Sequence, residues 1–161
     1  MAEYDIAFGE KLAVVAATVI AEGLDQRAAQ RTVLYLSWLS AEISLKAMLE
    51  QAGKPTVEIR GRSHDLSQLL ADLDKCTVDA EVASGVPRRV PASRLRSCVV
   101  KHAMAESTVG EIIEAESQGA SQYPNFRYGE ELHHFPPEAN AQMAASVAVF
   151  ARRHWHSIRA R

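Results

Sequence analysis

The sequence predicts an all-α protein, an antiparallel up-and-down bundle of about five helices formed by one domain over residues 1–161. Apolar residues recur at steps of three and four along several segments, which is the period of an amphipathic helix. The chain has 8 Gly and 6 Pro among its 161 residues, so signals for turns are few. No segment shows a convincing strand pattern of alternating apolar and polar residues.

The first two predicted helices form the N-terminal part of the bundle. The first covers about residues 4–22 and ends at Gly23. Its apolar stripe consists of Phe8, Leu12, Val15 and Val19. The second covers about residues 25–52, with Asp25 as its N-cap. This second helix is apolar over most of its circumference, so we expect it to be the central helix.

The third predicted helix is short and is capped by Ser63. It ends near Cys76, and its buried face consists of Leu66, Leu69, Leu70 and Leu73. The segments on either side of it, residues 54–62 and 77–91, contain Gly or Pro and have no helical period. We therefore predict that both are irregular connections.

The fourth predicted helix is long and covers about residues 95–117. Its apolar stripe, which includes Val99 and Val109, also carries His102 and Glu106. We expect these two ionisable side chains to pair at a bundle or dimer seam, and the alternative is a role in proton transfer. Residues 120–135 form a predicted loop, after which Pro136 opens a last helix that runs to the C-terminus.

Charge and cysteine content limit the class of protein. The 18 basic and 20 acidic residues give a net charge of -2, which excludes a uniformly basic nucleic-acid binder. Two basic segments remain candidates for phosphate contacts, residues 88–101 and 152–161. Cys76 and Cys98 are far apart, and the apolar run at residues 12–21 is too short to span a bilayer. We expect a cytoplasmic protein with reduced thiols and no membrane association.

The loop before the last helix contains the side chains best suited to catalysis. Arg127 precedes His133 by six residues and His134 by seven, which places an anion-binding group near a titratable one. A neutral His could take the proton of an RNA 2′-OH while Arg stabilises charge on the phosphoryl oxygens, without a metal. The alternative is a surface loop in which Arg127 pairs with Glu130 or Glu131.

Three segments of the chain resemble the HEPN family (higher eukaryotes and prokaryotes nucleotide-binding). They are the helical stretch from Leu39 to Gly53, the stretch from His64 to Leu70, and the loop from Tyr123 to Tyr128. The resemblance covers about residues 24–135 and depends on the order and spacing of these pieces. It implies a helical bundle that dimerises.

The resemblance also implies an activity. Many HEPN proteins are metal-independent ribonucleases, often toxins of toxin–antitoxin, defence or stress systems, with Arg-x4-6-His motifs that meet across a dimer. Arg127 with His133 or His134 fits that spacing, and the resemblance makes these three the catalytic candidates. Catalytic members have Asn, Asp or His after this Arg, whereas this chain has Tyr128. The prolines after the motif also place it in a loop rather than at a helix start.

Other HEPN proteins carry an Arg-Tyr-Pro type of loop and bind nucleotides or accompany a minimal nucleotidyltransferase. The run from Arg127 to Gly129 is similar to that loop. The expected function is therefore binding or cleavage of RNA or nucleotides. The alternative is a non-catalytic interaction module that partners a nucleotidyltransferase-type antitoxin.

Four further residues are candidate substrate contacts: Tyr123, Tyr128, Lys46 and His64. Lys46 either contacts phosphate or forms a partly buried salt bridge with Glu42 one helical turn earlier. His64 is either part of a site or a solvent-exposed residue at a helix start. We expect no metal, because no Glu-x-x-His motif on another helix accompanies the two that end at His133 and His134. We also expect no cofactor, and the sequence contains no Gly-rich loop that would hold a phosphate.

Overall fold

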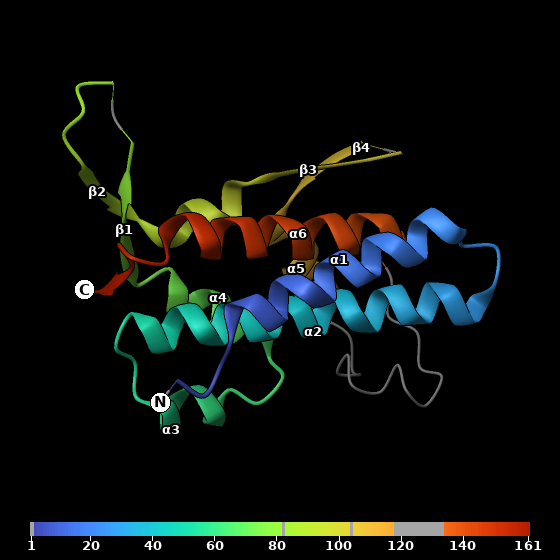
Figure 1. Ribbon diagram of the computed structural model, residues 1–161, viewed down its shortest axis with the longest axis horizontal. Helices are drawn as coiled ribbons and strands as arrows, with labels where there is room; N and C mark the ends of the chain where they lie inside the picture. The colour runs from blue at the N-terminus through green and yellow to red at the C-terminus, as the bar shows by residue number, and fades with distance from the viewer. Residues whose placement is uncertain (1, 82, 104, 118–133) are drawn as a thin grey trace.

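The computed structural model describes residues 2–81, 83–103, 105–117 and 134–161 (Figure 1). The structure is mainly helical, and helices contain 63% of the described residues. The α-helices are α1 (Ile6–Glu22), α2 (Arg27–Gln51), α3 (Thr56–Gly61), α4 (Leu66–Leu73), α5 (Val109–Ser117) and α6 (Pro137–His154). The other regular elements are a 3-10 helix, η1 (Ala92–Ser97), and short strands. The fold is therefore helical as predicted, but it is not a plain five-helix bundle.

Three long helices, α1, α2 and α6, lie side by side and form the body of the molecule (Figure 1). α1 ends at Gly23, whose φ of +118° favours glycine, and α2 returns antiparallel to α1. α6 runs in the same direction as α2 (Figure 1). Two contacts show this: Trp38 of α2 hydrogen-bonds Asn140 near the start of α6, and later in both segments Ala52 accepts a hydrogen bond from Ala160. The prediction of a strictly antiparallel bundle is wrong for this pair.

α2 is the central helix, as predicted, because it contacts α1, α3, α4 and α6. The indole N–H of Trp38 donates to Oδ1 of Asn140 at 2.7 Å inside the core, which satisfies both buried polar groups. The side chains of the surrounding core are large and apolar. Those fully buried include Leu45, Met48, Leu49, Leu69, Leu70, Ile112, Ile113 and Met143.

α1 approaches α2 closely at Gly9. The Ser40 hydroxyl donates a hydrogen bond of 2.6 Å to the carbonyl of Gly9. A Cβ atom at position 9 would lie 2.5 Å from the hydroxyl oxygen of Ser44. The missing side chain of Gly9 thus lets the two helices pack against each other.

The segment from 77 to 91, predicted to be irregular, contains two strands. β1 (Cys76–Ala80) pairs antiparallel with β2 (Arg88–Pro91) on one side and with β5 (Arg159–Ala160) on the other. Val78 and Val90 face each other in this sheet, and both are buried. The last helix therefore ends at His154 rather than at the C-terminus, and the final residues join the sheet.

The predicted long helix over residues 95–117 is also wrong. η1 is followed by an antiparallel hairpin of β3 (Val99–His102) and β4 (Ala105–Thr108), and only then by α5. A capping box separates the hairpin from α5, since Thr108 N–H donates to the Glu111 carboxylate and Glu111 N–H donates to the Thr108 hydroxyl. His102 and Glu106 thus lie on a hairpin and not on a helical stripe, and His102 Nε2 lies 3.2 Å from Ser107 Oγ.

The third predicted helix is confirmed as α4, with a correction to its cap. Asp65, not Ser63, is the N-cap residue, and its carboxylate accepts the Gln68 N–H at 3.0 Å.

Across the described ranges, no helix combines the length and apolar composition needed to cross a lipid bilayer.

Candidate functional site

Most of the predicted catalytic loop lies outside the described residues. This applies to Arg127, His133, Tyr123 and Tyr128. His134 is described: its side chain is exposed, and its backbone N–H donates to Oε1 of Glu116 at 2.5 Å. The same buried carboxylate accepts the N–H of Phe135 at 2.9 Å. The end of α5 thus fixes the backbone that leads from His134 into α6.

The other two predicted contacts, Lys46 and His64, are brought together by Glu42. Lys46 Nζ lies 2.6 Å from Oε1 of Glu42, and His64 Nδ1 lies 3.0 Å from Oε2 of the same carboxylate. Glu42 is 5% exposed and Lys46 is 7% exposed, whereas 43% of the His64 side chain is exposed. We call Glu42, Lys46 and His64 the Glu42 cluster.

Two local features of the chain position this cluster. Glu42 and Lys46 are one turn apart on α2, in the order that favours an ion pair. His64 lies in the turn between α3 and α4, directly before the N-cap Asp65. Ser63 takes a positive φ of 51° in this turn. The tight turn and the cap together place the His64 ring against α2.

The N-terminal segment covers the lysine of the cluster. The ring centroid of Tyr4 lies 5.5 Å from Lys46 Nζ, within the range of a cation–π contact. The backbone N–H of Tyr4 donates to the carboxylate of Glu50 on α2 at 3.0 Å. Arg60 on α3 forms an ion pair of 2.7 Å with Glu3. Burial, followed by the hydrogen bond with Glu3, raises the pKa of the Tyr4 hydroxyl.

The geometry gives each member of the cluster a chemical role. A carboxylate only accepts hydrogen bonds, so a neutral His64 carries its proton on Nδ1 and has Nε2 as its basic nitrogen. Lys46 is held by Glu42 and Tyr4 and forms the partly buried salt bridge that was one of its two predicted interpretations. Glu42 was predicted only as the partner of Lys46, and its contact with His64 was not predicted.

Several arginines of the two basic segments have structural roles. Arg89 donates to Asp79 at 2.8 Å and to the Thr77 hydroxyl at 2.6 Å, which ties β2 to β1. Arg96 pairs with Asp74 at 2.5 Å and with Glu114 at 3.1 Å. Arg152 pairs with Glu10 of α1. These arginines are therefore engaged in ion pairs within the chain.

Other arginines of these segments form no such ion pair among the described residues. Arg94 and Arg153 are exposed, and neither has an acidic partner among the described residues. Within the same ranges, no group of three or more His, Cys, Asp or Glu side chains is arranged to hold a metal ion.

No family model matches the chain, and the searches found neither a curated protein nor a solved structure similar to it. A functional assignment therefore rests on the residues of this chain.

Proposed function

We propose that this chain is a HEPN-like protein that binds or cleaves RNA or nucleotides. It acts as a homodimer, as the toxin or an accessory component of a toxin–antitoxin, defence or stress system. The observation that carries the proposal is the Glu42 cluster, in which Glu42 links Lys46 to His64. These residues come from two of the three segments on which the family resemblance rests, Leu39 to Gly53 and His64 to Leu70.

Burial of charge supports a site at this position. A charged pair taken out of water costs several kcal/mol per ion, by the order of magnitude known for proteins, and apolar residues of similar size often serve stability as well or better. At the edge of this buried pair, 43% of the His64 side chain is exposed, so the cluster can be reached from solvent. Glu42 orients the His64 ring, which can then hydrogen-bond a substrate.

In the proposed cleavage reaction, His133 is the base and Arg127 the anion-stabilising group, with His134 as the second candidate for the base. The neutral histidine takes the proton of the 2′-OH, and the 2′ oxygen attacks the adjacent phosphorus. The bond to the 5′ oxygen breaks, and that oxygen receives a proton from the imidazolium or from water. The products are a 2′,3′-cyclic phosphate and a 5′-hydroxyl end, and Arg127 stabilises the charge on the phosphoryl oxygens.

The second candidate function is a non-catalytic module that docks a nucleotidyltransferase-type partner. The contacts of Lys46 favour this module, because its ammonium group is already engaged by Glu42 and by the Tyr4 ring. A phosphate ligand would have to compete with both. In this case the segment from Arg127 to Gly129 binds the nucleotide or the partner.

Expression in a bacterial host separates the two functions. The ribonuclease arrests growth, and Arg127→Ala relieves the arrest. The matched control is His156→Ala, which removes an exposed histidine remote in sequence from the motif and leaves the arrest in place. Harmless expression of soluble wild-type protein, with RNA binding intact, favours the module. Harmless expression without binding of RNA or nucleotides contradicts the whole proposal.

A further inference from the structure

A cleft of about 600 Å³ lies where the β1–β2 hairpin, η1 and the end of α6 meet. Arg94 from η1 and Arg153 and His154 from α6 line one part of it. Glu81 and Pro87 from the hairpin line another. A volume of this size is within the range of about 300 to 1,000 Å³ that small-molecule sites occupy.

The cleft has an excess of positive charge on the side of α6 and η1. Arg94 and Arg153 both line it, and the described residues offer neither of them an acidic partner. Burial and then the charge of Arg153 lower the pKa of His154, and Arg94 acts in the same direction. Arg94, Arg153 and His154 thus share one side of the cleft.

The acidic residues on the β1 side do not cancel this charge. Asp79 is paired with Arg89, whose guanidinium also donates to the backbone carbonyls of Ser157 and Thr77. Glu81 is exposed and lies beside the cleft on the hairpin. One side of the cleft therefore has two arginines without an acidic partner among the described residues. The other side has two carboxylates, of which Asp79 is engaged by Arg89 and Glu81 can accept hydrogen bonds from hydroxyl groups.

Apolar surface lies between these charged sides. Phe150 lines the cleft, and its ring centroid is 4.5 Å from that of His154, with the rings tilted by 53°. Val86 and Pro87 on the hairpin also line it, and Val86 is 67% exposed. An organic group can therefore lie against aromatic and aliphatic side chains while its charged end reaches the arginines.

We propose that this cleft binds an organic phosphate that bears hydroxyl groups. Arg94 and Arg153 hold the phosphate, for which planar guanidinium groups are suited by their paired donors. The organic part lies against Phe150 and Pro87, with its hydroxyl groups toward Glu81. This inference does not depend on the function proposed for the Glu42 cluster and the Arg127 segment.

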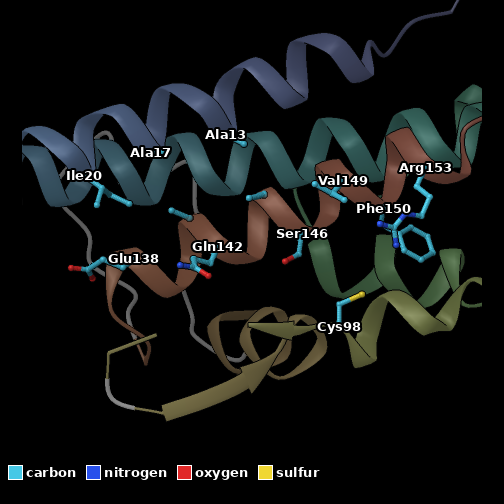
Figure 2. Close-up of a pocket in the computed structure, with 12 residues that line it drawn as sticks. Ala13, Ala17, Ile20, Cys98, Glu138, Gln142, Ser146, Val149, Phe150 and Arg153 are labelled. Carbon is cyan, nitrogen blue, oxygen red and sulfur yellow. The ribbon is translucent and has the colours of Figure 1, made fainter. Parts of the chain in front are cut away.

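The cleft adjoins a second groove, which runs along α6 beside α1 (Figure 2). This groove has a volume of about 590 Å³, and its lining includes Ala13 and Ala17 of α1. Cys98, Phe150 and Arg153 line both spaces. Figure 2 shows Glu138 at the opposite end of the groove from Phe150 and Arg153. A ligand with a longer apolar part can therefore extend along α6 from the same arginine.

Isothermal titration of the full chain with adenosine 5′-monophosphate and with ribose 5-phosphate tests the proposal. We expect at least one of them to bind, and adenosine or inorganic phosphate to bind at least about tenfold more weakly. Arg94→Gln and Arg153→Gln should each raise the dissociation constant by about tenfold or more, because each removes a charge-assisted contact.

Arg152→Gln is the matched control, since Arg152 lies in the same last turn of α6 but pairs with Glu10. Its effect on the helix dipole resembles that of Arg153→Gln. It also breaks the ion pair with Glu10, so a change in affinity seen only in Arg153→Gln reports a ligand contact. If Arg153→Gln does not fold, Arg153→Lys replaces it in the titration. This variant keeps the positive charge, so we expect its dissociation constant to rise by less than the tenfold expected on loss of the charge.

Four results overturn the proposal. One is that neither small phosphate binds to the wild type at millimolar concentration. Another is that inorganic phosphate binds as tightly as the organic phosphates, which leaves a simple anion site. The third is equal affinity in the wild type, Arg94→Gln and Arg153→Gln. Binding of an oligoribonucleotide alone also contradicts a small-molecule site.

Discussion

Oε2 of Glu42 lies 3.0 Å from Nδ1 of His64, although the two residues are 22 positions apart. The contact joins the middle of α2 to the turn that precedes α4. The other oxygen of the same carboxylate holds Lys46. One buried carboxylate thus sets the positions of a cation and of an imidazole ring, and changes at Glu42 should affect both.

We expect Glu42→Gln to lower the free energy of unfolding by about 3 kcal/mol, because it leaves the charge of the buried Lys46 uncompensated. Glu58→Gln is the matched control: Glu58 also pairs with a lysine four residues earlier in the chain, but 55% of its side chain is exposed. The control should lose no more than about 0.5 kcal/mol. Urea denaturation measures both values. Equal effects of the two variants would contradict a buried, stabilising pair.

Gly9→Ala should destabilise the protein by about 1 kcal/mol. The added methyl group meets the Ser44 hydroxyl and lies 3.3 Å from the Ser40 carbonyl oxygen, and this overpacking exceeds the gain in helix propensity. Thermal unfolding of Gly9→Ala, alone and combined with Ser44→Ala, measures the effect. The double variant should recover part of the loss. Gly61→Ala, where no atom lies within 4 Å of the new Cβ, is the control.

The stability should also depend on the protonation of His154. Burial, Arg153 and Arg94 lower the pKa of its ring below 6.5 in the folded protein, while contacts with Asp79 oppose the shift only in part. The unfolded chain therefore binds a proton more readily than the folded one. The stability from the neutral ring is complete above about pH 6.5, the unfolded value, and is lost as the pH falls toward the folded pKa.

His154→Gln tests this dependence. The stability of the wild type relative to this variant should decrease between pH 7.5 and about pH 5, as chemical denaturation at each pH will show. His156→Gln, which removes an exposed histidine two residues later, is the matched control. A wild type that gains stability relative to His154→Gln as the pH falls would contradict the sign of the shift.

The helices that were predicted correctly are those whose apolar period extends over many residues. α1, α2 and α6 have such stripes, and a glycine or a proline marks the end of α1 and the start of α6. The helix predicted from Leu95 to Ser117 failed because the steps between Leu95, Val99 and His102 suit a helix, while pairing of Val99 and His102 with β4 decides the structure. Strand formation here depends on the partner strand, so residues 99–102 taken alone show no period that would have predicted a strand.

The β1–β2 pair escaped prediction for a related reason. β1 is five residues long, and its register against β2, with Val78 opposite Val90, is set across an intervening turn.

Only single residues of the candidate site could be predicted from the sequence. Lys46 and His64 were visible as residues, but their common partner depends on the turn around Ser63, whose positive φ no local pattern indicated.

Single-turnover cleavage of RNA by the wild type and by His133→Ala, with a chelator present, tests the central claim most directly. Removal of a general base should lower the rate by roughly 100- to 10,000-fold, with little change in RNA affinity. His134→Ala should retain most of the activity, and Arg127→Ala should lose both cleavage and affinity. Full activity in His133→Ala would contradict the assignment of the base, and absence of both metal-independent cleavage and RNA or nucleotide binding by the wild type would contradict the account itself.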